Sequence, residues 1–233
     1  MYNNRYLGIV YEDWMLMLNQ VLSMSIKKVT FSQFCKYLSK TGMHKYNAAK
    51  AIDKEINSEY QIPKDYWGLL RSHIKHVLAN SGKADDLDDC LDRVAEDRKS
   101  NYLSRIEGLK KYWGKKTFEK VNLPKKEWKH KDLRVKVYAE LCYSYRERIH
   151  IVKLFFSNET KKITKNEADL LLEVMKETYG FDSNEVVYGI LDLPKGTLFK
   201  YKKNAPEISM LVRCEAETLL KMLNQLEQNT NET

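Results

Sequence analysis

The stretch LDLPKGTLFKYKKN, Leu191–Asn204, places lysines and aromatic residues directly after a short apolar segment. Lysine ammonium groups neutralise phosphates and release counterions from nucleic acid, and hydroxyl groups hydrogen-bond to phosphate oxygens. An exposed phenylalanine beside them could contact a thymine methyl group. The stretch therefore predicts a nucleic-acid-binding segment whose contacting residues are Lys195, Thr197, Phe199, Lys200 and Lys203.

The middle of the chain carries most of the positive charge. The net charge of the protein is +8, but residues 98–165 hold 20 Lys and Arg against 7 Asp and Glu, an excess of 13. Such an excess creates a strong local field in any fold. The aromatic residues among these cations could stack on bases or anchor a core, and we favour the core. We expect the duplex backbone to be held by Lys125, Lys126, Lys129, Lys131 and Arg134.

Catalytic and metal-binding patterns are missing from the sequence. It contains no GxGxxG, Walker loop or HExxH, and no histidine follows a nucleophile elbow. His73 and His76 share a helical spacing but have no third ligand nearby, and the four cysteines lie far apart. We expect a protein without enzymatic activity, cofactor or metal.

The same sequence indicates a cytoplasmic protein. Its widely spaced cysteines are typical of reduced core residues. The most apolar run near the start, Trp14–Met24, is far shorter than the roughly 20 residues that a membrane span needs. We therefore expect no membrane association.

The elements that would position these side chains are expected to be helices. Only 9 Gly and 4 Pro interrupt the chain, and apolar residues recur mostly three and four positions apart. Capping boxes mark two helix starts, at Thr30 with Gln33 and at Thr164 with Glu167. The spacing predicts an all-α, multi-helix protein with further helices over 9–24, 44–58, 64–80, 84–112, 132–156, 184–191, 195–203 and 207–227. A strand over His150–Phe156 is outweighed by the helical run around it.

Three of the four prolines share a local pattern, QIPKDYW, NLPKKEW and DLPKGTL. Proline is favoured in the first turn of a helix, so each instance predicts a helix start. Whether the three copies mark a true repeat stays open.

Residues 183–202, SNEVVYGILDLPKGTLFKYK, resemble the helix-turn-helix of the lambda-repressor-like family. Ser183 takes the capping position, Leu193 the buried position of the turn, and Leu198 and Tyr201 the buried face of the second helix. The resemblance implies that this second helix enters the major groove, with Lys195 and Thr197 at its start and the other cations on its exposed side.

Three regions are expected: an N-terminal helical region over 1–97, a basic central helical region over 98–160 and a helix-turn-helix domain over 161–233. The preferred interpretation is a bacterial or phage transcriptional regulator that binds double-stranded DNA. A homodimer is expected from the two-fold symmetry of operators.

The alternative is a helical inhibitor or adaptor that binds a protein. Phe199 favours it because an exposed phenylalanine is an odd group to present to DNA, and Tyr188 favours it because the lambda-repressor-like family usually has a small residue there, where its two helices approach closely. The C-terminal part is also faintly similar to the helix-turn-helix part of phage anti-CRISPR proteins. That similarity implies a Cas effector as the partner.

Overall fold

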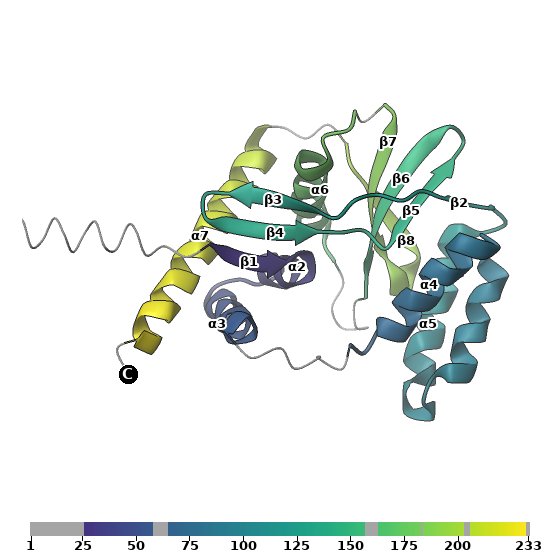
Figure 1. Ribbon diagram of the computed structural model, residues 1–233, viewed down its shortest axis with the longest axis horizontal. Helices are drawn as coiled ribbons and strands as arrows, with labels where there is room; N and C mark the ends of the chain where they lie inside the picture. The colour runs from purple at the N-terminus through teal and green to yellow at the C-terminus, as the bar shows by residue number, and fades with distance from the viewer. Residues whose placement is uncertain (1–25, 58–64, 157–162, 183, 203–205, 232–233) are drawn as a thin grey trace, which may run out of the picture.

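The computed structural model describes residues 26–57, 65–156, 163–182, 184–202 and 206–231. Its α-helices and 3-10 helices (η) are α2 (Phe31–Leu38), α3 (Met43–Asn57), α4 (Gly68–Asn80), η1 (Ala84–Arg93), α5 (Glu96–Trp113), α6 (Lys165–Tyr179), η2 (Leu193–Lys195) and α7 (Pro206–Asn231). Its strands are β1 (Lys27–Thr30), β2 (Glu119–Lys120), β3 (Lys126–His130), β4 (Leu133–Val137), β5 (Leu141–Tyr145), β6 (Arg148–Phe155), β7 (Val186–Asp192) and β8 (Thr197–Lys200). The fold is mixed α and β (Figure 1).

The prediction of an all-α protein is wrong. Residues 132–156 form strands β4, β5 and β6 where one helix was expected. In β4 the side chains of Leu133, Val135 and Val137 are buried, while Arg134 and Lys136 between them point outward. This alternation has the period of two that belongs to a strand, and the longer helical reading obscured it.

The expected helix-turn-helix is a strand, a turn and a strand. β7 runs parallel to β6 along seven residue pairs, from Ile149 with Val186 to Phe155 with Asp192. It then turns through η2 and returns antiparallel as β8. β7 is buried on both faces of its sheet, and a continuously apolar strand of this kind has no periodicity that separates it from a buried helix.

Proline and glycine in DLPKG serve this turn. Pro194 is the second residue of η2, and Gly196 takes a left-handed conformation with φ of 60°. α5 approaches the turn so closely that a Cβ atom on Gly108 would lie 1.6 Å from the carbonyl oxygen of Leu193. The glycines therefore allow backbone to pack directly on backbone.

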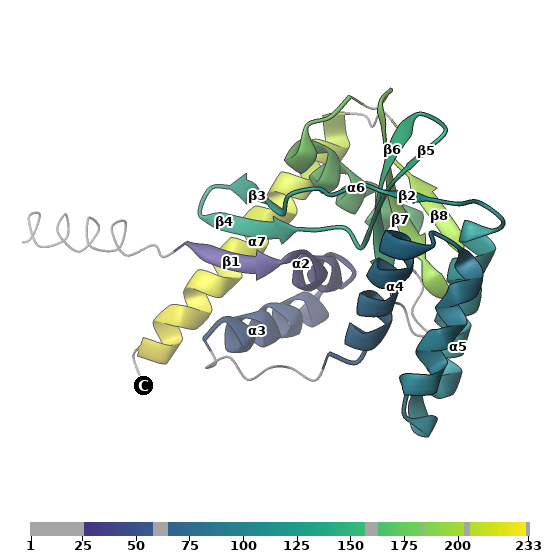
Figure 2. The ribbon, with the colours of Figure 1, turned by 45° about the vertical axis from the view of Figure 1, so that its right-hand side comes forward.

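The five-stranded sheet, in the order β2-β5-β6-β7-β8, is covered on both faces. Ile151, Tyr188 and Ile190 point into a core that includes residues of α6 and α7. Val152 and Leu191 point into a second core built with α4, η1 and α5. The two views agree that α4 and α5 lie on one side of this sheet and α6 on the other (Figure 2).

Among the described residues, the three-stranded sheet, in the order β1-β4-β3, is covered on one face only. Val29, Trp128 and Val135 on its inner face belong to the same core as buried residues of α2, α6 and α7. In Figure 1 α7 passes behind these strands, and their other face is turned toward the viewer.

Both predicted capping boxes are confirmed. The Thr30 hydroxyl accepts a hydrogen bond from the Gln33 amide, and the Thr164 hydroxyl accepts one from Glu167. The helices expected over 44–58 and 207–227 are confirmed as α3 and α7, whereas 84–112 divides into η1 and α5. The helix expected over 9–24 lies outside the described residues.

The three Pro-Lys motifs do not mark three helix starts. QIPKDYW precedes α4, but NLPKKEW leads into strand β3 and DLPKGTL forms η2 and the start of β8. The backbone amide and carbonyl groups of Lys126–His130 form hydrogen bonds with β4, so this segment is a strand and not the start of a helix.

Both sheets combine strands from different expected regions. β1, from region 1–97, pairs with β4, and β6, from region 98–160, pairs with β7. Within the described part of the chain, no helix has the length and apolar character that crossing a bilayer requires.

Candidate nucleic-acid interface

The uncovered face of the three-stranded sheet carries a row of cations that comes from all three strands. Lys28 of β1 lies opposite Arg134 of β4, and Arg134 lies opposite Lys129 of β3. A second row places Lys136 opposite Thr30 on one side and Glu127 on the other. We call the outward residues of these two rows the basic sheet face: Lys28, Thr30, Glu127, Lys129, Arg134 and Lys136.

This arrangement opposes folding. Like charges directly opposite one another on neighbouring strands destabilise a sheet. Among the described residues, no carboxylate lies within ion-pair distance of Lys28, Lys129 or Lys136. Arg134 donates instead to backbone, including the Leu133 carbonyl oxygen at 3.1 Å. The face thus carries four cations and one carboxylate, that of Glu127, and a polyanion would relieve the repulsion.

The other central residues predicted to contact DNA are placed differently. Lys125 is exposed just before β3. Lys126 is two residues before Trp128 in β3, so its side chain points to the same inner face of the sheet. Its ammonium group donates to the Tyr179 carbonyl oxygen at 3.4 Å and lies over the Phe181 ring. Its expected role on the DNA-facing side does not fit this orientation.

Lys131 lies at the tip of the β3–β4 hairpin and is engaged by a carboxylate. Its ammonium group is 2.9 Å from Glu217 of α7, which also contacts the His130 ring at 3.1 Å. Hydrogen bonds from Lys131 and His130 lower the pKa of Glu217, so the carboxylate is charged at neutral pH. The positive charge of Lys131 is therefore partly compensated.

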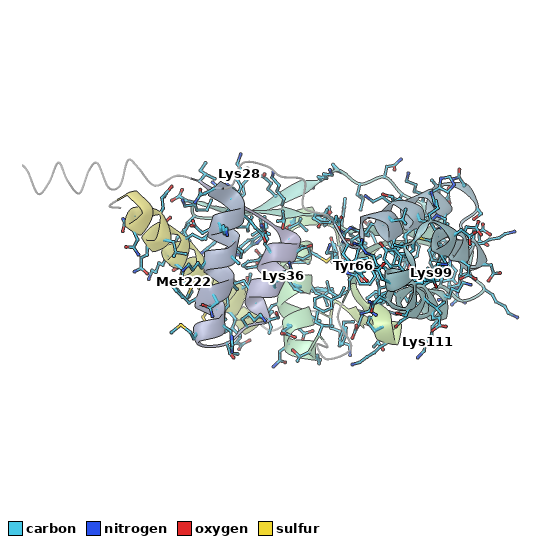
Figure 3. All side chains as sticks on the ribbon, turned by 90° about the horizontal axis from the view of Figure 1, so that it is seen from below. Lys28, Lys36, Tyr66, Lys99, Lys111 and Met222 are labelled. Atoms are coloured by element: carbon cyan, nitrogen blue, oxygen red, sulfur yellow. The ribbon has the colours of Figure 1, made fainter. Side chains whose placement is uncertain are left out.

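The C-terminal residues predicted to contact DNA do not lie on one helix face. Lys195 and Thr197 line a shallow depression against α5, together with Ser104, Gly108 and Lys111. In the view from below, Lys111 lies at the lower edge of the molecule and Lys28 at the upper edge (Figure 3). This depression and the basic sheet face are thus on different sides.

Phe199 was expected to be exposed, and that prediction is wrong. Its side chain is half-buried and packs against the core on the α6 face of the sheet, because alternation along β8 turns it away from Leu198 and Lys200. Lys200 is exposed on the opposite face, near His150. Lys203 lies outside the described residues.

Two cations of the basic sheet face were missed from the sequence. Lys136 follows Arg134 at the strand period of two, so an alternating reading of LRVKV would have found it. Lys28 reaches this face only because β1 pairs with a strand more than a hundred residues later, and no local pattern signals that pairing.

The histidine pair that was considered for metal binding is engaged in other contacts. The Nε2 atom of His73 lies 2.9 Å from the Asp86 carbonyl oxygen, and its Nδ1 atom lies 2.8 Å from the Arg93 guanidinium. In the described parts of the chain, no three His, Cys, Asp or Glu side chains gather as metal ligands.

Comparison with known proteins does not assign a family. No protein-family model, curated protein sequence or solved structure matches this chain.

Proposed function

We propose that the protein binds double-stranded DNA by its phosphate backbone, through the basic sheet face. The observation that supports this proposal is the uncovered cross-strand row of Lys28, Arg134 and Lys129. Neighbouring strands lie about 4.8 Å apart, so the row spans roughly 10 Å, and long side chains extend its reach. Four cations within that area can engage several phosphates of one backbone segment.

Backbone contacts of this kind position a protein without reading sequence. With residues 186–192 and 197–200 in strands, this segment supplies no recognition helix for the major groove. We therefore expect binding with little sequence preference. This surface suits a protein that binds DNA without sequence preference better than it suits a regulator of one specific operator.

Charge reversal on the sheet tests the proposal. The variant Lys129→Glu/Arg134→Glu should bind a random 20-base-pair duplex at least tenfold more weakly than the wild type, measured by fluorescence anisotropy, because it places carboxylates among the phosphates. The matched control is Lys36→Glu/Lys54→Glu on α2 and α3, where both lysines are exposed. It changes the net charge equally and should bind within about twofold of the wild type. Equal losses in both variants would contradict a defined interface.

A protein partner has one observation in its favour. Four large apolar side chains are exposed on α3 and α7: Met43, Tyr46, Met210 and Leu211. An ion pair between Lys45 of α3 and Glu215 of α7 joins the two helices. We propose a second copy of the chain as the partner that covers these exposed side chains. Sedimentation velocity should then detect a dimer that Met210→Asp/Leu211→Asp converts to a monomer, and a wild type that is monomeric at high concentration would exclude it.

A further inference from the structure

A stack of four aromatic rings runs from the core of the protein toward the surface and ends beside a group of cations. Trp113 stacks on Phe118 with ring centroids 4.8 Å apart, and Phe118 stacks on Tyr143 at 3.8 Å. Tyr143 stacks in turn on His150 at 4.8 Å, with the planes 10° apart. Trp113 and Phe118 are buried, whereas His150 is only partly buried. The stack therefore begins in the core and ends near the surface.

The open end of the stack is surrounded by positive charge from three elements. Lys200 of β8, Arg148 of β6 and Lys116 after α5 all act electrostatically on His150. The ammonium group of Lys116 also lies 5.9 Å from the ring of Tyr145. Within the described residues, no carboxylate pairs with Lys116 or Lys200. The acids nearest in sequence are Glu147, exposed at the tip of the β5–β6 hairpin, and Glu119, exposed in β2 opposite Ser144.

That hairpin tip is held in an unfavourable conformation. Arg146 and Glu147 both have positive φ, at 50° and 60°. Two-residue turns of this type normally contain Asn and Gly, because other side chains are strained there. The turn places the Arg146 guanidinium 5.3 Å from the Tyr145 ring, at the same end of the sheet as His150. Strain that persists beside a cation cluster indicates a functional constraint.

We propose that His150 stacks on an unpaired base of single-stranded nucleic acid, while Lys116, Arg146 and Lys200 hold its phosphates. Proteins that bind single strands combine an aromatic platform with a positively charged groove in this way. The imidazole suits the role because its ring already lies within 10° of parallel to the Tyr143 ring, so its other flat side can receive a further ring in the same stack. Val187 lies opposite His150 on β7 and is half-buried, so it leaves an apolar floor beside the ring.

The inference shares its ligand class, nucleic acid, with the proposed function and so rests on it, but it concerns a second site. A ten-nucleotide single strand with a central 2-aminopurine is the probe, because stacking quenches the fluorescence of this base. Wild-type protein should quench it on binding. His150→Ala should bind at least tenfold more weakly and lose the quenching, whereas His150→Phe should retain both, since it preserves a flat ring.

Lys200→Ala provides a variant whose folding is not in question, because the side chain is exposed. It should weaken binding of the single strand severalfold without changing the affinity for duplex. Lys129→Glu/Arg134→Glu should weaken binding of the duplex without changing the affinity for the single strand. The two variants therefore distinguish a failure of the proposed single-strand site from a failure of the proposed duplex site. The proposal is overturned if His150→Ala quenches like the wild type, or if Lys200→Ala and Lys54→Ala bind the single strand equally well.

Discussion

At the residue scale, His150 is the side chain whose protonation is most clearly linked to stability. Its burial, followed by the charges of Lys200 and Arg148, lowers its pKa to about 4. The unfolded chain, with a histidine pKa of about 6.5, therefore binds one more proton than the folded protein between those two pH values. Stability is fully present above about pH 6.5 and decreases as the pH falls toward about 4.

This linkage predicts the effect of His150→Asn. The variant cannot take up that proton in the unfolded state, so its free energy of unfolding should change less between pH 6.5 and 4.5 than that of the wild type. Urea unfolding at several pH values measures this difference. Parallel pH profiles for the two proteins would show that His150 is not the group responsible.

Lys153 and Glu140 form a buried ion pair beneath α2. The Lys153 ammonium lies 2.5 Å from one Glu140 oxygen, and the other oxygen accepts the Leu154 amide at 2.9 Å. Each of the two residues is 4% exposed. Burial alone would lower the pKa of Lys153, but the Glu140 carboxylate outweighs it and raises this pKa. The charge of Lys153 therefore depends on Glu140.

Removing one member should cost more than removing both. Lys153→Met leaves a buried carboxylate unpaired and should lower the free energy of unfolding by about 3–5 kcal/mol. Lys153→Met/Glu140→Gln keeps the acceptor for the Leu154 amide and should recover most of that loss. Urea denaturation of both variants measures the difference, and a double variant as unstable as the single one would contradict this reading.

At the element scale, the contact between α5 and η2 depends on the absence of a side chain at Gly108. Replacing glycine by alanine inside a helix is normally stabilising by about 0.5–1 kcal/mol. Here the added Cβ atom would overlap the Leu193 carbonyl oxygen, so Gly108→Ala should destabilise by about 1–3 kcal/mol or more. Thermal unfolding tests the sign, and a raised melting temperature would mean that the two elements do not touch.

The helices were more predictable than the strands for a physical reason. Capping residues such as Thr30 and Thr164 act on backbone three residues away, so the sequence alone contains that information. The alternation of apolar and charged residues in β4 indicates a strand, but its five residues were too few to outweigh the helical spacing around them. β7 carries no periodic signal, since both of its faces are buried. Its identity depends on pairing with β6, which a local pattern does not contain.

The residues of the candidate site were also predictable only in part. Lys129 and Arg134 were predicted as backbone contacts, and the structure brings them together on one face. Lys200 was predicted on a helix and is instead exposed on a strand, near His150. Phe199 was misplaced because a helical wheel and a strand assign opposite sides to the same residue.

At the scale of the whole molecule, charge is distributed unevenly over the surface. The basic sheet face lies on one side, and the exposed end of the aromatic stack belongs to the other sheet. A protein that holds a duplex at the first surface and an unpaired base at the second would favour junctions between double and single strands. An oligonucleotide with both features should bind more tightly than either part alone, because the second contact becomes intramolecular.

The salt dependence of duplex binding tests the central claim most directly. Each phosphate neutralised contributes about −0.9 to the slope of log K against log salt concentration. Engagement of Lys28, Lys129, Arg134 and Lys136 with four phosphates predicts a slope of about −3.6 for the wild type. The slope for Lys129→Glu/Arg134→Glu should be about half as steep. A slope near zero for the wild type, or the same slope for both proteins, would contradict DNA binding through the basic sheet face.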